Sequence, residues 1–386
     1  MKILHTGDWH VGRSLRGRSR IDEQKVVLEE IVEITREEAV DLVLVVGDIF
    51  DSSAPTAEVE ELVYKTLLDL AGTGAEVLVI AGNHDSPYRL KAIRPLLLLT
   101  RVHTVPFPAA PREGGVIDFQ TKSGEVARVA VLPFLSQRGV VRADRLMAGE
   151  ADEHAQAYGD RCRRILAQLC EGFDTSTVNL VVAHLAVVGG QVGGGERQAH
   201  TVFDYFASPQ IFPANAHYVA LGHLHRSQSI PGACPIWYCG SPLQLDFGDD
   251  DEERSVLLVE VHPSEPALVR PRTLSGGRSL QTISGTLAQL ETQRESVGEA
   301  FLRVIVHENP RAGLADEVRD MFPNAIDVSV RVDESRSTAD LQDDRAWSRA
   351  PAELFEEYLR ERSIEDPRLL RLFDELLEEV NETEAA

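Results

Sequence analysis

The chain has 386 residues, of which 43% are hydrophobic and 26% are charged, and its formal net charge is −23 at pH 7. This length predicts two or three domains, and the composition excludes a wholly disordered protein. So negative a charge argues against a nucleic-acid-binding protein, because nucleic-acid-binding domains are usually basic.

The sequence has no sign of a membrane or export segment. No apolar run reaches the roughly 18 residues of a membrane span, and Asp8 and His10 stand where a secretory signal has its apolar core. The cysteines form no CxxC motif, so we expect reduced thiols in a cytoplasmic protein, with a Cys234–Cys239 disulfide as the less favoured alternative. They are Cys162, Cys170, Cys234 and Cys239.

The N-terminal hundred residues alternate short apolar runs with amphipathic helical patterns. Strands are expected at 2–6, 42–48 and 76–82, and helices at 22–40, 57–72 and 86–99. Alternation of this kind is typical of βαβ units, in which helices cover a largely buried sheet. The sequence therefore predicts an α/β fold.

Further elements follow in the middle of the chain. A hairpin is expected over 115–134, then a helix over 152–171, then strands at 179–184, 218–223, 236–242 and 255–261. The SGGRS stretch near 275–280 is typical of a linker. The pattern beyond it predicts a small α+β module with a helix near Leu314–Met321.

The chain ends in a strongly helical and acidic tail. Residues 351–386 contain 12 acidic and 4 basic residues, a net charge of −8. Much of the negative charge is thus far from the N-terminus in sequence, which weakens the argument against a nucleic-acid partner. We expect three parts: 1–274 as the first and largest domain, 280–335 as the small α+β module, and 350–386 as a helical tail.

Several expected strands end in the same kind of polar motif. These motifs are TGDWH, VGDIFD, AGNHD, VAH and LGHLH, and each follows an apolar run. Because ligands bind at the carboxyl ends of strands in open α/β sheets, we expect these side chains to meet. They supply Asp8, His10, Asp48, Asn83, His184, His223 and His225.

This mixture of imidazole, carboxylate and amide groups favours manganese, iron or zinc over calcium. Seven ligands exceed the needs of one ion, so two ions sharing one carboxylate is the economical interpretation. Any one motif alone is equally well explained as an ordinary turn, because Asp and Asn are common turn residues. The occurrence of five in order is what favours a metal site.

In this order the motifs resemble the calcineurin-like metallophosphoesterase superfamily and, within it, the bacterial SbcD nucleases. HTGDWHVG, GDIFD, AGNHD, GHLH and GSPLQLDFG carry the resemblance, which covers the chain to about residue 270. The resemblance implies a metallophosphoesterase-type sandwich with helices flanking the sheets over 1–274, which would be the nuclease domain. It also implies that the α+β module over 280–335 is a capping domain that binds DNA, and that the helical tail over 350–386 follows it.

The resemblance also implies roles for individual residues. Asp8, His10 and His225 would hold one divalent ion, and Asn83, His184 and His223 the other. Asp48 would bridge the two ions, for which Mn²⁺ is the expected metal. His84 would be the catalytic histidine, supported by the carboxylate of Asp51.

A local cluster of arginines follows the first motif: Arg13, Arg16, Arg18 and Arg20. Guanidinium groups beside the metals would hold the phosphates that flank the scissile one. The alternative is a solvated loop, or arginines paired with the acidic helix that starts near Asp22.

The leading hypothesis is a metal-dependent DNA nuclease of recombination, repair and replication. The resemblance implies 3′–5′ exonuclease activity on duplex DNA and endonuclease activity on single strands or hairpins. It further implies a homodimer through helices near 55–71 and 86–99, and a complex of two copies with two SbcC ATPase subunits. By pattern, the tail is equally suited to docking on that partner or on its own core. The alternatives are a phosphatase or phosphodiesterase acting on a small molecule or phosphoprotein, and an inactive scaffold.

Overall fold

The computed structural model describes residues 1–121, 124–136, 158–193, 206–249, 254–294 and 296–331, and five residues of the tail. The chain divides into two compact units. The first comprises 1–281 with 299–301, and the second 282–298 with 302–386. Within the described residues, no helix is both long and apolar enough to cross a membrane.

The first unit contains two six-stranded sheets. One sheet has the strand order β16–β15–β1–β4–β5–β6, and its four strands from β1 to β6 run parallel. Strands β15 and β16 add to it antiparallel. The strands of this sheet are β1 Lys2–Thr6, β4 Leu42–Val45, β5 Glu76–Ile80, β6 Val102–Val105, β15 Ser255–His262 and β16 Glu265–Thr273.

The other sheet has the order β13–β14–β12–β9–β8–β7, with a parallel centre and an antiparallel strand at each edge. The edge pair β7–β8 is the predicted hairpin. The strands of this sheet are β7 Val116–Gln120, β8 Val126–Leu132, β9 Val178–His184, β12 Tyr218–Gly222, β13 Gln228–Ile230 and β14 Ile236–Tyr238.

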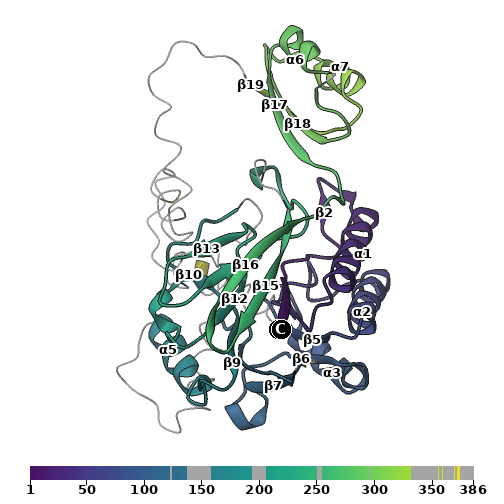
Figure 1. Ribbon diagram of the computed structural model, residues 1–386. Coiled ribbons are helices and arrows are strands. Elements are labelled where there is room, and N and C mark those ends of the chain that lie inside the picture. Colours follow the sequence, from purple (N-terminus) through teal and green to yellow (C-terminus); the bar gives the residue numbers. More distant parts are fainter. Residues whose placement is uncertain are drawn as a thin grey trace. The chain divides into compact units, whose positions relative to one another are not determined.

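The two sheets pack face to face, with helices on the outer faces. Ile3, Leu44 and Ile80 from one sheet share a buried cluster with Val131 and Val182 from the other. Helices α1 to α3 cover the first sheet, while α5 covers the second, and Figure 1 shows the two helical groups on opposite sides. The helices are α1 Ile21–Glu37, α2 Ala57–Gly72, α3 Pro87–Leu97 and α5 Tyr158–Leu169. The predicted α/β sandwich with flanking helices is therefore confirmed.

Short elements complete this unit. A small hairpin, β2–β3, precedes α1, and the 3₁₀ helix η1 continues α3. These elements are β2 Ser14–Leu15, β3 Arg18–Ser19, η1 Leu98–Thr100, η2 Pro111–Glu113, β10 Ala186–Val187, β11 Phe206–Ala207, η5 Pro209–Ile211 and η6 Phe247–Asp249. The SGGRS stretch is irregular coil, but Ser275 and Gly276 donate main-chain hydrogen bonds to Glu30 of α1, so it is tied down rather than loose.

The second unit is built on the sheet β17–β18–β19, in which β18 and β19 are parallel. Its elements are β17 Leu280–Gly285, α6 Leu287–Gln293, β18 Phe301–His307, α7 Leu314–Met321 and β19 Ala325–Arg331. The expected helix is α7. Of the tail, helical residues Phe355, Leu359, Leu369, Leu372 and Phe373 are described.

All four cysteines are free in the structure, so the Cys234–Cys239 disulfide is absent. Burial raises the pKa of the Cys162 and Cys170 thiols to about 12. Protonated thiols of this kind are unreactive packing groups, in keeping with the absence of a CxxC motif.

A buried histidine joins the two sheets of the sandwich. His5 on β1 is fully buried, with Nδ1 2.8 Å from the Tyr218 hydroxyl and Nε2 3.2 Å from the Leu221 carbonyl oxygen. Burial lowers the pKa of His5 to about 3, although the bond to Leu221 acts in the opposite direction. His5 is therefore a neutral core residue.

We expect this histidine to make the fold acid-sensitive. Between pH 6.5 and about 3 the unfolded chain protonates His5 while the folded protein excludes that proton, so unfolding free energy falls as pH falls. His5→Gln keeps a hydrogen-bonding side chain but does not titrate. As pH is lowered, the unfolding free energy of this variant should fall less steeply than that of the wild type. The two slopes should differ by up to about 1.4 kcal/mol per pH unit, as measured by urea titrations from pH 4.5 to 7.5. Equal slopes in the two proteins would contradict this role.

Candidate metal centre

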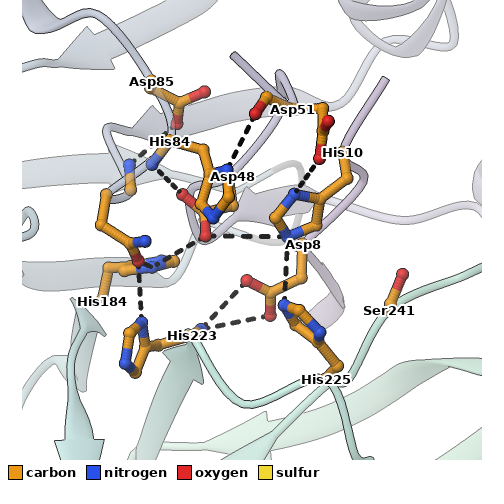
Figure 2. Close-up of polar contacts among 12 residues, drawn as sticks. Asp8, His10, Asp48, Asp51, His84, Asp85, His184, His223, His225 and Ser241 are labelled. Atoms are coloured by element: carbon orange, nitrogen blue, oxygen red, sulfur yellow. Dashed lines mark hydrogen bonds and ion pairs between the residues drawn. The ribbon is translucent and has the colours of Figure 1, made fainter. Parts of the chain in front are cut away.

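The predicted ligands lie together where strand ends of both sheets meet. The first sheet supplies the residues after β1, β4 and β5, and the second supplies those at the ends of β9 and β12 (Figure 2). All are at least nine-tenths buried: Asp8, His10, Asp48, Asn83, His184, His223 and His225. Residues far apart in sequence thus converge, because parallel strands deliver their carboxyl ends to one edge.

Asp48 occupies the centre of this group. Its Oδ2 lies 3.7 Å from Nε2 of His10 and 3.4 Å from Nε2 of His184. Its Oδ1 accepts a hydrogen bond from the main-chain N–H of His84 at 2.7 Å. One carboxylate therefore faces both sides of the site.

The remaining donors fall on either side of Asp48. Ligand atoms of Asp8, His10 and His225 lie within 4.8 Å of one another, and Nε2 of His10 is 3.1 Å from Nε2 of His225. On the other side, Asn83 Oδ1 lies 3.0 Å from Nε2 of His184 and 2.8 Å from Nδ1 of His223.

This donor set fits divalent metal ions. Imidazole nitrogens that face one another at 3.1 Å, with a buried carboxylate nearby, leave lone pairs directed into one small volume. Nitrogen and oxygen donors without thiolates suit first-row divalent ions. The grouping on both sides of one carboxylate supports a centre for divalent metal.

The loops that carry the ligands are held in unusual backbone conformations. Asp8, His10, Asp48 and His223 all have positive φ, between 46° and 101°. Non-glycine residues are uncommon there, and such strain concentrates at functional sites. The strain is tolerated here because the loops are held from both sheets; for example, Asp8 accepts the main-chain N–H of His223 at 3.0 Å.

Glycines precede several ligands because the loops approach too closely for a side chain. A Cβ on Gly82 would lie 2.2 Å from Oδ1 of Asp48, and one on Gly47 would lie 2.5 Å from Nδ1 of His184. Gly47 also has φ of +92°. The glycine of each GD and GN motif thus permits contact between neighbouring loops.

The electrostatics of the site couple Asp48 to His184. Burial opposes a charge on either group, but their attraction lowers the pKa of Asp48 and raises that of His184 to about 9. Nδ1 of His184 donates to the Val46 carbonyl oxygen at 2.7 Å, which orients Nε2 toward the site. A metal ion that binds His184 must displace a proton, so binding releases protons to solvent.

His84 lies beside the donors and is held by Asp51, but not in the expected way. Nδ1 of His84 is 2.8 Å from the main-chain carbonyl oxygen of Asp51. The Asp51 carboxylate instead lies 3.3 Å from Nδ1 of His10 and 3.2 Å from the Arg13 guanidinium. The supporting group of His84 is therefore a carbonyl. An Nδ1–H donated to it places the lone pair of the neutral ring on Nε2.

Two positioning residues were not singled out by the sequence. Asp85, the last residue of AGNHD, accepts main-chain N–H groups of Gly82 at 2.8 Å and Phe50 at 3.0 Å, and so ties the loop after β5 to the loop after β4. Burial and the nearby Asp48 charge raise the pKa of Asp85 to about 7. Gln24 of α1 donates to the His10 carbonyl oxygen at 2.9 Å. The only sequence signal for Asp85 was its place in a motif.

The four predicted DNA-binding arginines have different surroundings. Arg13 forms the ion pair with Asp51 already described. Arg16 and Arg18 lie on the exposed β2–β3 hairpin, with Arg16 at its turn. The guanidinium of Arg18 lies 5.0 Å from the centre of the Phe301 ring.

Arg20 is buried, with 2% of its surface exposed. Its guanidinium donates to Glu23 at 2.8 Å, to the carbonyl oxygen of Arg278 at 3.3 Å and to that of Gln244. These contacts hold the side chain in place and fix the base of the hairpin.

Comparisons with known proteins place this chain in a family. The calcineurin-like phosphoesterase family model matches residues 1–227, which contain every predicted metal ligand. Named relatives are similar over a longer stretch. The chain is 36% identical over 285 residues to the D subunit of the SbcCD nuclease of Bacillus subtilis, covering 72% of this chain and 71% of that protein.

Two other relatives carry the same name. Identity is 34% to the Rhodobacter capsulatus protein, with coverage of 68% of this chain and 66% of the relative. It is 29% to the Escherichia coli K12 protein, with coverage of 76% and 74%. The chain thus belongs to the calcineurin-like phosphoesterase family, within the group of SbcCD nuclease D subunits.

Proposed function

We propose that this protein is a metal-dependent nuclease that hydrolyses phosphodiester bonds of DNA, as the D subunit of an SbcCD complex. The observation that carries the proposal is the position of Asp48, whose carboxylate contacts His10 on one side and His184 on the other. The names of the relatives support a nuclease rather than another phosphoesterase. The actions implied by the resemblance are exonuclease cleavage of duplex ends and endonuclease cleavage of single strands and hairpins.

Two divalent ions, Mn²⁺ by preference, would occupy the centre. Asp8, His10 and His225 would hold one, Asn83, His184 and His223 the other, with Asp48 between them. The ions would polarise the phosphodiester and activate a water molecule. Two dications against the carboxylates of Asp8 and Asp48 give the site a net charge of +2, so it attracts phosphate despite the acidic chain.

His84 would act on the leaving oxygen. Its ring meets the His10 ring edge-on with centroids 4.6 Å apart, and its ligand atom lies within 4.8 Å of those of His10 and Asp48. His84 is thus at the proposed metal pair, where we assign it the transfer of a proton and not a metal ion. The Asp51 carbonyl oxygen accepts the Nδ1–H, so the imidazolium form of His84 would carry its second proton on Nε2 and give it to the departing oxygen, which leaves the ring neutral.

The other candidate function is hydrolysis of a small phosphodiester or a phosphoprotein by the same centre. The exposed hairpin arginines favour the polymer, because a small substrate does not extend beyond the scissile group. Comparing the kcat/KM for hairpin DNA with that for a generic aryl phosphodiester distinguishes the two functions.

We expect His84→Gln to retain both metal ions and lose cleavage. The main-chain N–H that contacts Asp48 is kept, so the centre should remain intact. Without a proton-carrying imidazole, kcat should fall roughly 10²- to 10⁴-fold. The test measures cleavage of hairpin and blunt duplex DNA with Mn²⁺, and the number of metal ions bound per chain.

His103→Gln is the matched control, since His103 pairs with Glu76 rather than with any site residue. It should keep full activity. Loss of metal from the His84 variant would make His84 a ligand, and unchanged cleavage would remove its catalytic role. A wild-type protein that cleaves no DNA with Mn²⁺, Mg²⁺ or Zn²⁺ would favour an inactive scaffold.

We infer that the arginines divide into two roles. Arg16 and Arg18 are exposed and would contact phosphates that flank the scissile one. Arg13 and Arg20, with their carboxylate and carbonyl partners, would instead position the loop and the hairpin base.

The double variant Arg16→Ala/Arg18→Ala should bind duplex DNA more weakly and with a flatter salt dependence. Loss of two phosphate contacts should reduce the slope of log K against log salt by about 1.8. Arg270→Ala/Arg272→Ala is the control, because these arginines on β16 already pair with Glu260 and Glu37. Fluorescence-anisotropy titrations between roughly 50 and 200 mM salt measure the DNA affinity of each variant and its salt dependence. Identical slopes for the wild type and the hairpin variant would exclude phosphate contacts by Arg16 and Arg18.

We propose that two copies associate through α2 and α3–η1, and that two SbcC ATPase subunits join them. Helix α2 contacts η1, and this surface exposes large apolar residues: Leu99 is 83% exposed, Leu96 66% and Tyr88 61%. Apolar surface of this kind marks interaction sites. In this proposal residues 1–274 form the nuclease domain in the cytoplasm, 280–335 cap the DNA, and 350–386 dock on SbcC.

Leu96→Glu/Leu99→Glu should convert the dimer to a monomer, because burying two carboxylates in an apolar interface is strongly unfavourable. Leu268→Glu, at a 57% exposed position on β16, is the control. Sedimentation velocity measures the association state of the wild type and of each variant, alone and with SbcC. The wild type with SbcC should sediment as two copies of each; a monomeric wild type at micromolar concentration would contradict the proposal.

A further inference from the structure

An aromatic side chain stands at the edge of the metal centre, and the proposed mechanism leaves it without a role. Phe134 follows the end of β8, two residues after Leu132. Its main-chain N–H donates to the carbonyl oxygen of Ala81 at 3.0 Å, immediately before the loop that carries Asn83 and His84. Phe134 is thus fixed to the loop of one sheet while it extends a strand of the other.

The ring of Phe134 contacts both histidines on one side of Asp48. It lies nearly parallel to the His223 ring, with centroids 6.2 Å apart and planes at 23°. It meets the His184 ring edge-on at 6.1 Å and 83°. The ring therefore borders the position where Asn83, His184 and His223 converge.

Phe134 differs in exposure from three other large aromatic residues of this unit. Trp9, Phe50 and Tyr238 are at most 2% exposed and serve as core. Phe134 is only partly buried, whereas the histidines beside it are 0% and 3% exposed. A ring that keeps exposed surface next to buried polar side chains is poorly explained as core packing alone.

We propose that Phe134 is a stacking platform for a nucleobase adjacent to the scissile phosphate. The inference rests on the proposed nuclease function and adds the group that binds the base. In a nucleotide the base is separated from its phosphate by one sugar. If the phosphate is bound at the metals, its base is therefore within reach of a ring that contacts the ligand histidines. Aromatic faces stack on any base, so such a platform binds a strand without reading its sequence. It also favours bases that are unstacked, as in single strands and hairpin loops.

The test compares Phe134→Leu and Phe134→Trp on two oligonucleotides. One is an intact single strand, and the other has abasic sites at the nucleotides that flank the cleaved bond. Leu preserves the apolar contact with the histidines but removes the π face, so kcat/KM on the intact strand should fall roughly 5- to 100-fold, mainly through KM. Trp should retain activity. On the abasic strand, wild type and Phe134→Leu should be equal within about twofold.

Phe107→Leu is the matched control, because Phe107 is a part-buried aromatic that contacts Tyr88 and Lys91 instead of site histidines. It should behave as wild type on both strands. An equal loss for Phe134→Leu on both strands, or loss of bound Mn²⁺, would show that the ring only supports the histidines. Unchanged kcat/KM of Phe134→Leu on both strands would also contradict the proposed stacking role. Failure of the wild type to cleave the intact strand would instead refute the nuclease function itself.

Discussion

The carboxylate of Asp48 is held from three directions. One oxygen accepts the main-chain N–H of His84, and the other lies between the imidazoles of His10 and His184. These contacts come from loops after β1 and β5 and from the end of β9, so one side chain joins the two sheets at the site. A buried carboxylate is stable only with such partners, and their attraction outweighs the cost of burial. Any shift of these loops would separate the two sides of the metal centre.

The same constraint explains the local backbone. Positive φ at four ligand residues and glycines with no space for a Cβ both follow from the close approach of neighbouring loops. Asp85 contributes by accepting N–H groups from both the Asp48 loop and the Asn83 loop. The sandwich core beneath, which includes residues such as Ile3 and Val182 with no measurable exposure, gives these loops a rigid base. Strain at the site is thus supported by packing below it.

The charge distribution resolves the conflict between an acidic chain and an anionic substrate. The tail carries a net charge of −8, whereas the metal centre would carry a net positive charge once two dications bind. Within the N-terminal cluster, Arg13 and Arg20 pair with Asp51 and Glu23, and Arg16 and Arg18 lie on the exposed hairpin. Local charge, rather than the total, decides which ligand a surface attracts.

The sequence by itself determined the strands, most helices and the residue types at the strand ends, because these depend on local patterns of apolar and polar residues. It also predicted that seven polar side chains would meet, since parallel strands bring their carboxyl ends to one edge of a sheet, and the seven do lie together. Only the tertiary structure decided that Asp51 supports His84 through its carbonyl, that Arg20 is buried, and that Phe134 borders two ligand histidines. Those facts depend on how loops distant in sequence pack against one another. The pattern of apolar and polar residues within one segment does not predict such contacts.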